Sequence, residues 1–129
     1  MSETKPTNPK DMVGLTKLPM FSVVSPASLA YEAWAMRNGA EKYGPYNYRA
    51  NGVRAGVYID AAIRHLGAWW DGEDLAEDSK VHHLAHAKAC LGIIIDGIEH
   101  GNLVDDRPPK SNFPGILTKL QKDDKNGSY

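Results

Sequence analysis

The sequence predicts an all-α fold, a compact bundle of three main helices with irregular N- and C-terminal segments. Apolar residues recur every three or four positions in three long stretches, as they do on the buried face of a helix. Helix boundary signals flank these stretches, with Ser25 and Pro26 before the first and Gly101 and Asn102 after the last. No alternating five-residue strand pattern competes seriously with these helical assignments.

Length and composition indicate one soluble domain. The chain has 129 residues, of which 42% are hydrophobic and 24% charged, enough for one core of ordinary size. A formal net charge of −1 provides no broad cationic surface, so nucleic acid is not expected as a partner. Cys90 is the single cysteine, and no apolar run reaches the roughly 18 residues of a membrane span. We therefore expect a cytoplasmic protein without a membrane partner.

These patterns divide the chain into three parts. Residues 1–9 are rich in proline, threonine and asparagine and are predicted to form a flexible arm. Residues 10–109 form the all-α domain, in which residues 10–24 are expected to lie over the other helices. Residues 110–129 are predicted to be a tail with one short amphipathic helix.

The first two predicted helices span about residues 26–42 and 53–70. Ser25 is expected to cap the first helix. In the second helix Asp60 and Arg64 are four positions apart, a spacing that suits a surface ion pair. If Arg64 is buried instead, its fork of N–H groups would suit a phosphate. The apolar residues expected to point inward are Val57, Ala61, Ile63, Leu66 and Trp69.

The third predicted helix begins after a cap at Ser79 and continues to about residue 100. His83 and His86 are three positions apart and therefore share a face. Such a pair can act as acid and base or donate to phosphate, but it can also pack and hydrogen-bond locally. Residues 91–98 are apolar on more than one face, which three helices can hardly cover. We therefore expect a homo-oligomer.

Two connecting segments offer further functional groups. Residues 71–78 (DGEDLAED) contain five carboxylates and form either a magnesium site or a solvated acidic turn. Residues 43–52 (YGPYNYRANG) contain three tyrosines that could stack on a base or pack on the helices. Lys42 and Arg49 could meet phosphate there.

Four ordered pieces of the chain resemble a known family. KDMVGLTKLPMF, GAEKYGPYNYR, YIDAAIRHLGAWWDGED and HHLAHAKACLGIIID are similar to the N-terminal domain of phage and bacterial dATP/dGTP diphosphohydrolases, the MazZ-like proteins. The resemblance covers roughly residues 8–109, and it implies an oligomeric all-α enzyme that uses Mg²⁺ or Mn²⁺. Its substrate would be a purine deoxynucleoside triphosphate, from which it removes pyrophosphate, so residues 10–109 become a nucleotide-binding domain.

The resemblance also implies roles for individual residues, taken together with the chemistry of each side chain. The implied catalytic residues are Glu73, His83 and His86. The implied metal ligands are Asp60, Glu73 and Asp78. The implied nucleotide-binding residues are Lys42, Tyr43, Asn47, Tyr48, Arg49, Arg64 and His65.

The chain departs from related proteins at the metal site. Pyrophosphohydrolases of the MazG kind hold magnesium with a Glu-x-x-Glu pair on one helix and a Glu-x-x-Asp pair on the next. Here Glu73 is followed three residues later by Ala76, and Glu77 by Lys80. Two hypotheses follow: a metal-dependent diphosphohydrolase, or a non-hydrolytic protein that sequesters a nucleotide or a nucleotide-derived signal.

Overall fold

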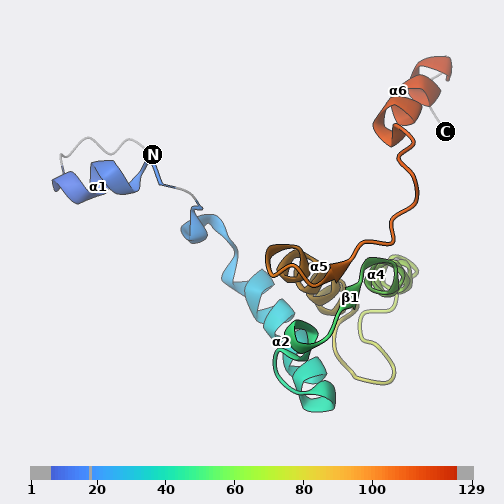
Figure 1. Ribbon diagram of the computed structural model, residues 1–129, viewed down its shortest axis with the longest axis horizontal. Coiled ribbons are helices and arrows are strands. Elements are labelled where there is room, and N and C mark those ends of the chain that lie inside the picture. Colours follow the sequence, from blue (N-terminus) through green and yellow to red (C-terminus); the bar gives the residue numbers. More distant parts are fainter. Residues whose placement is uncertain (1–6, 18, 125–129) are drawn as a thin grey trace.

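The computed structural model describes residues 7–17 and 19–124 (Figure 1). Within this part of the chain there are six α-helices, one 3₁₀ turn and two very short strands, so the prediction of an all-α fold is confirmed. In chain order the elements are α1 (Pro9–Gly14), η1 (Phe21–Val23), α2 (Pro26–Tyr43), α3 (Asn47–Ala50), β1 (Val53–Arg54), α4 (Ala55–Trp70), α5 (His83–Glu99), β2 (Leu103–Val104) and α6 (Phe113–Asp123).

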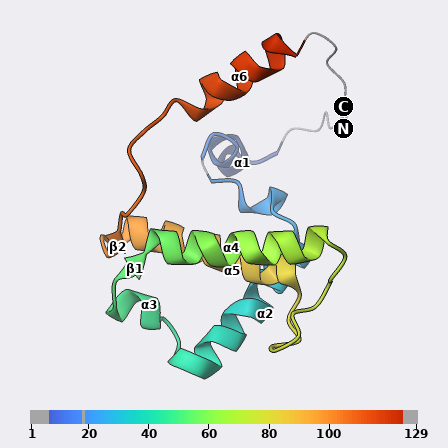
Figure 2. The same cartoon turned by 90° about the vertical axis from the view of Figure 1, so that its right-hand side faces the viewer.

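The three long helices form the bundle, and α5 packs against both α4 and α2 (Figure 2). Its core is made of small side chains, with Ala35 of α2 against Ala85 and Ala89 of α5. Such side chains let two helix backbones approach closely. At the edge of this contact the Lys88 Nζ donates to the Ser28 carbonyl at 3.0 Å, which ties α5 to the first turn of α2.

Helix α2 has the boundaries that its sequence predicts. The Ser25 hydroxyl accepts a hydrogen bond from the Ser28 N–H at 3.3 Å, and Pro26 occupies the first turn. The helix ends at Tyr43 and is capped by Gly44, which adopts a φ of 91° that glycine reaches at little cost. The chain then turns into α3 within the predicted loop.

Helix α4 begins two residues later than predicted because Val53 and Arg54 pair in parallel with Leu103 and Val104. Val53 is completely buried there and packs over α5 at Gly97, where the helix has no side chain. The N-terminus of α4 is capped from the C-terminal tail, because the Gly56 N–H donates to the Asp106 carboxylate at 2.7 Å. A pairing between segments fifty residues apart leaves no local periodicity to predict it.

Helix α5 begins at His83, so the predicted cap at Ser79 is wrong. Ala76 and Val81 are buried, and Lys80 has a left-handed φ of 63°, which together keep residues 79–82 out of the helix. The cap is His82, whose Nδ1 accepts the Leu84 N–H at 3.0 Å.

The acidic segment 71–78 and the four residues after it form one ordered loop, the connector of residues 71–82. The Glu73 N–H donates to the Ala68 carbonyl at 3.0 Å, and the His83 N–H donates to the Asp74 carbonyl at 2.9 Å. Leu75 and His82 form an antiparallel bridge. These bonds fix Glu73 beside the first turn of α5.

The terminal segments differ from the central bundle. Every described residue between Lys10 and Val24 is exposed, so this segment does not cover the helices as predicted. The short C-terminal helix is confirmed as α6, which projects from the bundle, as α1 does (Figures 1 and 2). The predicted flexibility of residues 1–6 and 125–129 lies outside the described residues. None of the described helices has the length and hydropathy to cross a membrane.

We expect Val53→Ala to lower the free energy of unfolding by about 1.5–2.5 kcal/mol, because it removes two fully buried methyl groups. Urea denaturation followed by circular dichroism measures the change. Val23→Ala is the matched control, since Val23 is 74% exposed and should shift the midpoint little. Equal losses in both variants would contradict the assigned core.

Candidate functional site

A cavity of about 990 Å³ lies between α2, α4 and α5. The loop after α2 and the end of the connector complete its wall. The polar side chains that line it include Asn38, Lys42, Asn47, Arg64, His65, Asp78, Ser79 and His86. Apolar walls come from Met36, Val57, Ala61, Ala89 and Ile93. The cavity therefore combines a charged cluster with apolar surface, as sites for organic anions do.

Three imidazole rings cluster at one side of this cavity. The rings of His65 and His86 stack with centroids 4.5 Å apart and an interplanar angle of 18°. The ring of His83 lies 5.1 Å from that of His65, and their Nδ1 atoms are 2.9 Å apart. His83 is buried, whereas His65 and His86 line the cavity.

Burial keeps the two cavity histidines neutral near pH 7. The pKa of His65 is lowered by burial first, and then by His86, His83 and Arg64, while Asp78 opposes this shift. Burial likewise lowers the pKa of His86, with Asp78 acting in the opposite direction and Lys42 in the same one. Neutral imidazoles have a free nitrogen lone pair, so they accept protons rather than bind phosphate as cations.

Glu73 faces the histidines and not the cavity. Its Oε1 lies 2.5 Å from Nε2 of His83. Ser79 holds the next histidine in the same way, with its hydroxyl 2.8 Å from Nε2 of His86. Two of the three predicted catalytic residues, Glu73 and His83, thus contact each other directly. Neither lines the cavity, whereas His65 and His86 do.

The loop residues divide into two groups. Lys42, Tyr43, Asn47 and Tyr48, which are among the predicted nucleotide-binding residues, line the cavity. Arg49 does not line it. Its guanidinium forms two hydrogen bonds with Asp96 of α5, at 3.0 and 2.9 Å, and fastens the loop to that helix.

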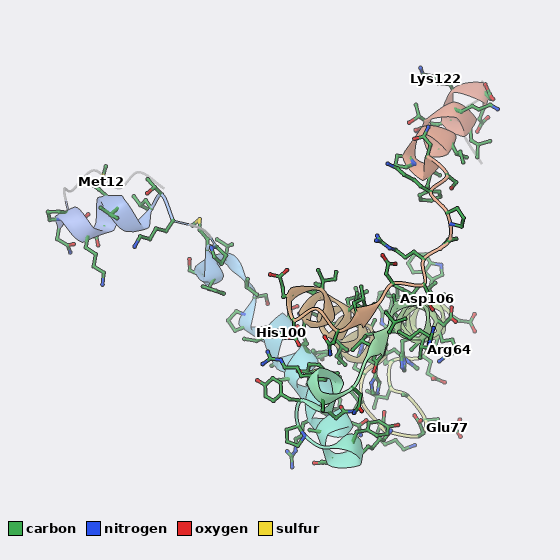
Figure 3. The ribbon with its side chains drawn as sticks, viewed as in Figure 1. Met12, Arg64, Glu77, His100, Asp106 and Lys122 are labelled. Carbon is green, nitrogen blue, oxygen red and sulfur yellow. The ribbon has the colours of Figure 1, made fainter. Side chains whose placement is uncertain are left out.

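Arg64 and Asp60 of α4 differ in their position relative to the cavity. Arg64 and Asp60 are both exposed, so Arg64 is not buried, and of the two only Arg64 lines the cavity. No ion pair joins these two residues in the described part of the chain. Figure 3 shows Arg64 on the bundle, far from Met12 and Lys122 on the outlying helices.

The residues predicted as metal ligands do not converge. Asp78 lines the cavity, Glu73 turns to His83, and Asp60 lies outside. Across residues 7–17 and 19–124, no group of three or more histidine, cysteine or acidic side chains could hold a metal ion. The pKa of Asp78 is lowered mainly by a hydrogen bond from the Ser79 N–H, so it meets the cavity as a carboxylate. One chain therefore offers one carboxylate to a cation in the cavity.

Some residues of the site were missed by the sequence analysis. Tyr58 lies three residues before Ala61 and seven before His65, so helical spacing could have placed it on the cavity face. Asn38 lies four residues before Lys42, so helical spacing could also have placed it on the cavity face. The pairing of Asp96 with Arg49 has no local sequence signal, because 47 positions separate the two residues.

Comparison with protein families gives a match over most of the chain. A family model described as dATP/dGTP diphosphohydrolase, N-terminal, matches residues 7–107. No curated protein and no solved structure matches the chain. The matched segment contains every residue that lines the cavity.

We expect the melting temperature to fall as the pH is lowered from about 7.5 to 5.5. The unfolded chain protonates its histidines near pH 6.5, whereas native His65 and His86 resist protonation until a lower pH. Acid therefore favours the unfolded state in this window. His86→Gln should flatten the dependence measured by calorimetry, and His100→Gln, at an exposed position, should leave it unchanged. A melting temperature independent of pH would contradict the lowered pKa of these two half-buried histidines.

Proposed function

Because the chain belongs to the dATP/dGTP diphosphohydrolase N-terminal family, we propose that it binds a purine deoxynucleoside triphosphate in the cavity and hydrolyses it to the monophosphate and pyrophosphate. The observation that carries the proposal is the meeting of Lys42, Arg64 and two neutral histidines at a cavity large enough for one nucleotide.

The cations suit the triphosphate. Lys42 at the end of α2 and Arg64 on α4 reach the cavity from different helices, so together they can neutralise charge on two sides of a phosphate chain. The tyrosines Tyr43 and Tyr48 offer rings for a base, and the amides of Asn38 and Asn47 offer donors and acceptors for its edge. This division assigns phosphates to the charged cluster and the base to the loop.

The divalent cation is proposed to arrive with the nucleotide. Mg²⁺ commonly binds through one or two carboxylates together with substrate phosphates and water, and Mn²⁺ accepts the same oxygen ligands. Asp78 supplies such a carboxylate at the cavity wall. A Mg²⁺ or Mn²⁺ complex of the nucleotide therefore fits a site that has no complete ligand set of its own. The cytoplasm, which contains these complexes, is the proposed compartment.

A second candidate function is nucleotide sequestration without cleavage. The separation of Asp60, Glu73 and Asp78 favours it, because each predicted metal ligand has a different environment. This candidate keeps the same cavity and the same cations, and it differs only in the fate of the ligand.

We expect dATP or dGTP, incubated with the protein and Mg²⁺ or Mn²⁺, to be converted to monophosphate and pyrophosphate. Chromatography after denaturation identifies the products, and intact nucleotide bound to the protein would support sequestration instead.

Arg64→Ala should weaken nucleotide affinity at least about tenfold, since it removes a charge-assisted phosphate contact. Arg107→Ala is the matched control, because Arg107 pairs with Asp105 on the tail and does not line the cavity. Equal affinity in both variants would contradict the assigned phosphate position.

We further propose that the protein is a homo-oligomer of at least two copies. The chain exposes 10750 Å² of surface, whereas a folded monomer of its mass exposes about 6800 Å². Obligate interfaces bury roughly 2000–5000 Å². The segments that project from the bundle, α1 and α6 among them, account for part of this excess. The apolar face of the bundle itself supports a second copy.

The face proposed for the second copy lies on the α4–α5 pair. Exposed apolar side chains on it are 41–84% accessible and comprise Ile59, Ile63, Leu66, Trp70, Leu91, Ile95 and Ile98. Their spacing of three and four forms one stripe on each helix. Ile59 near the start of α4 and Ile98 near the end of α5 line one shared apolar hollow, so the stripes run side by side. A monomeric protein rarely exposes so continuous a patch.

Light scattering on the full chain should give a mass of at least twice 14.2 kDa at micromolar concentration. Ile95→Glu places a charge in the proposed interface and should lower that mass, because an unpaired carboxylate resists burial. Val23→Glu, at an exposed position outside the bundle, should leave it unchanged. A wild-type mass of one chain would overturn the oligomer.

A further inference from the structure

Three polar side chains form a continuous relay that ends at the cavity. Glu73 Oε1 lies 2.5 Å from Nε2 of His83, and Nδ1 of His83 lies 2.9 Å from Nδ1 of His65. The connector, α5 and α4 each contribute one member. The relay begins at a carboxylate that is about half exposed, crosses the buried His83 ring, and reaches His65 at the cavity wall.

The two distances determine where the protons lie in a neutral relay. A carboxylate only accepts hydrogen bonds, so the N–H of His83 is at Nε2 and donates to Glu73. Its Nδ1 then has a lone pair, and it accepts from the Nδ1–H of His65. The remaining nitrogen of His65, Nε2, is consequently unprotonated. Among the described residues none hydrogen-bonds to it.

We propose that His65 is the general base of the hydrolysis and that Glu73 and His83 are positioning residues that act through it. This inference rests on the proposed function, and it gives His65 a different role from the nucleotide contact expected from sequence. The two histidines expected from sequence to be catalytic, His83 and His86, differ in their access to the cavity. His83 is buried and both of its ring nitrogens are hydrogen-bonded, whereas His86 lines the cavity.

The step balances without a further reactant. His65 Nε2 takes a proton from water as the water oxygen bonds to the α-phosphorus. The bond from that phosphorus to the bridging oxygen breaks, and pyrophosphate leaves with the electron pair. The Nδ1–H of the resulting imidazolium still points at His83, whose Nε2–H points at the Glu73 carboxylate, so the positive charge that forms is stabilised.

The surroundings of His65 favour this role. His86 stacks on it from α5, His83 bonds to it, and Arg64 lies next to it in the chain. With Asp78 of the connector, these are the groups whose charges act on the pKa of His65. Burial, His86, His83 and Arg64 lower this pKa against the opposite effect of Asp78, so the ring is unprotonated near pH 7. Lys42 acts on the neighbouring His86. A base must be neutral before it can accept a proton.

Kinetics separate this role from a structural one. His65→Gln should lower kcat about a hundredfold or more with little change in KM. Glu73 does not line the cavity, so Glu73→Ala should also lower kcat and spare KM, and Glu73→Gln should lose less because its amide oxygen can still accept from His83. Glu77→Gln, on the exposed part of the same connector (Figure 3), is the matched control. Added imidazole should restore activity to His65→Ala, and it should not stimulate the control.

Nuclear magnetic resonance tests the relay without any reaction. Nitrogen-15 spectra of the full chain at pH 7.5 should show His65 protonated at Nδ1 and His83 protonated at Nε2. In Glu73→Ala, His83 should lose its preference for that tautomer. A His65 protonated at Nε2, or a doubly protonated His83, would refute the relay.

The outcomes of the two experiments are distinct. If the wild type cleaves nucleotide and His65→Gln retains its kcat, the relay is not catalytic and the proposed function stands. If the wild type cleaves no nucleotide, the proposed hydrolysis and the catalytic role of His65 both fail, whatever the tautomers are. The expected tautomers together with a loss of kcat restored by imidazole support both proposals.

Discussion

The close approach of α2 to α5 is the constraint on which the rest of the molecule depends. Ala35, Ala85 and Ala89 bring the two helices together without bulky side chains. Next to this contact the cavity occupies the space that α2, α4 and α5 leave between them. Small residues thus hold the bundle together, and larger polar residues on the same helices reach into the cavity. A larger side chain at Ala85, which is fully buried, would separate the helices and deform the cavity.

The elements that sequence could predict are those with local causes. Ser25 and Pro26 cap α2 through contacts within one turn, so its start was predictable. Ser79 has the same chemistry, but the burial of Val81 and the backbone of Lys80 keep it in the connector. The burial of Val81 against residues distant in sequence, such as Ala35, thus overrides the local capping signal of Ser79. The composition of the segment alone does not reveal that burial. The set of residues predicted to point into the core from α4 was also wrong within a single chain. Val57, Ile63 and Leu66 are exposed there.

The candidate site was predictable as a set of residue types and not as an arrangement. Helical spacing places His65 and Arg64 near one another, and the loop composition indicates Lys42 and Tyr43. The direction of each side chain depends on partners elsewhere in the chain. Glu73 was expected to hold a cation, yet its carboxylate faces His83. Arg49 was expected to meet phosphate, yet Asp96 engages two of its three donor nitrogens, Nε and Nη2.

The fastening of the loop to α5 has a consequence for how the chain folds. Arg49 bonds to Asp96 across 47 positions, and the Asn102 amide donates to the Tyr48 carbonyl across 54. Loop closure over such separations costs entropy before any contact compensates for it. During synthesis the loop emerges well before Asp96 and Asn102. Its cavity-facing conformation can therefore be fixed only after the end of α5 has been synthesised. A nascent chain that ends at residue 95 contains every residue that lines the cavity but lacks both ties that orient the loop.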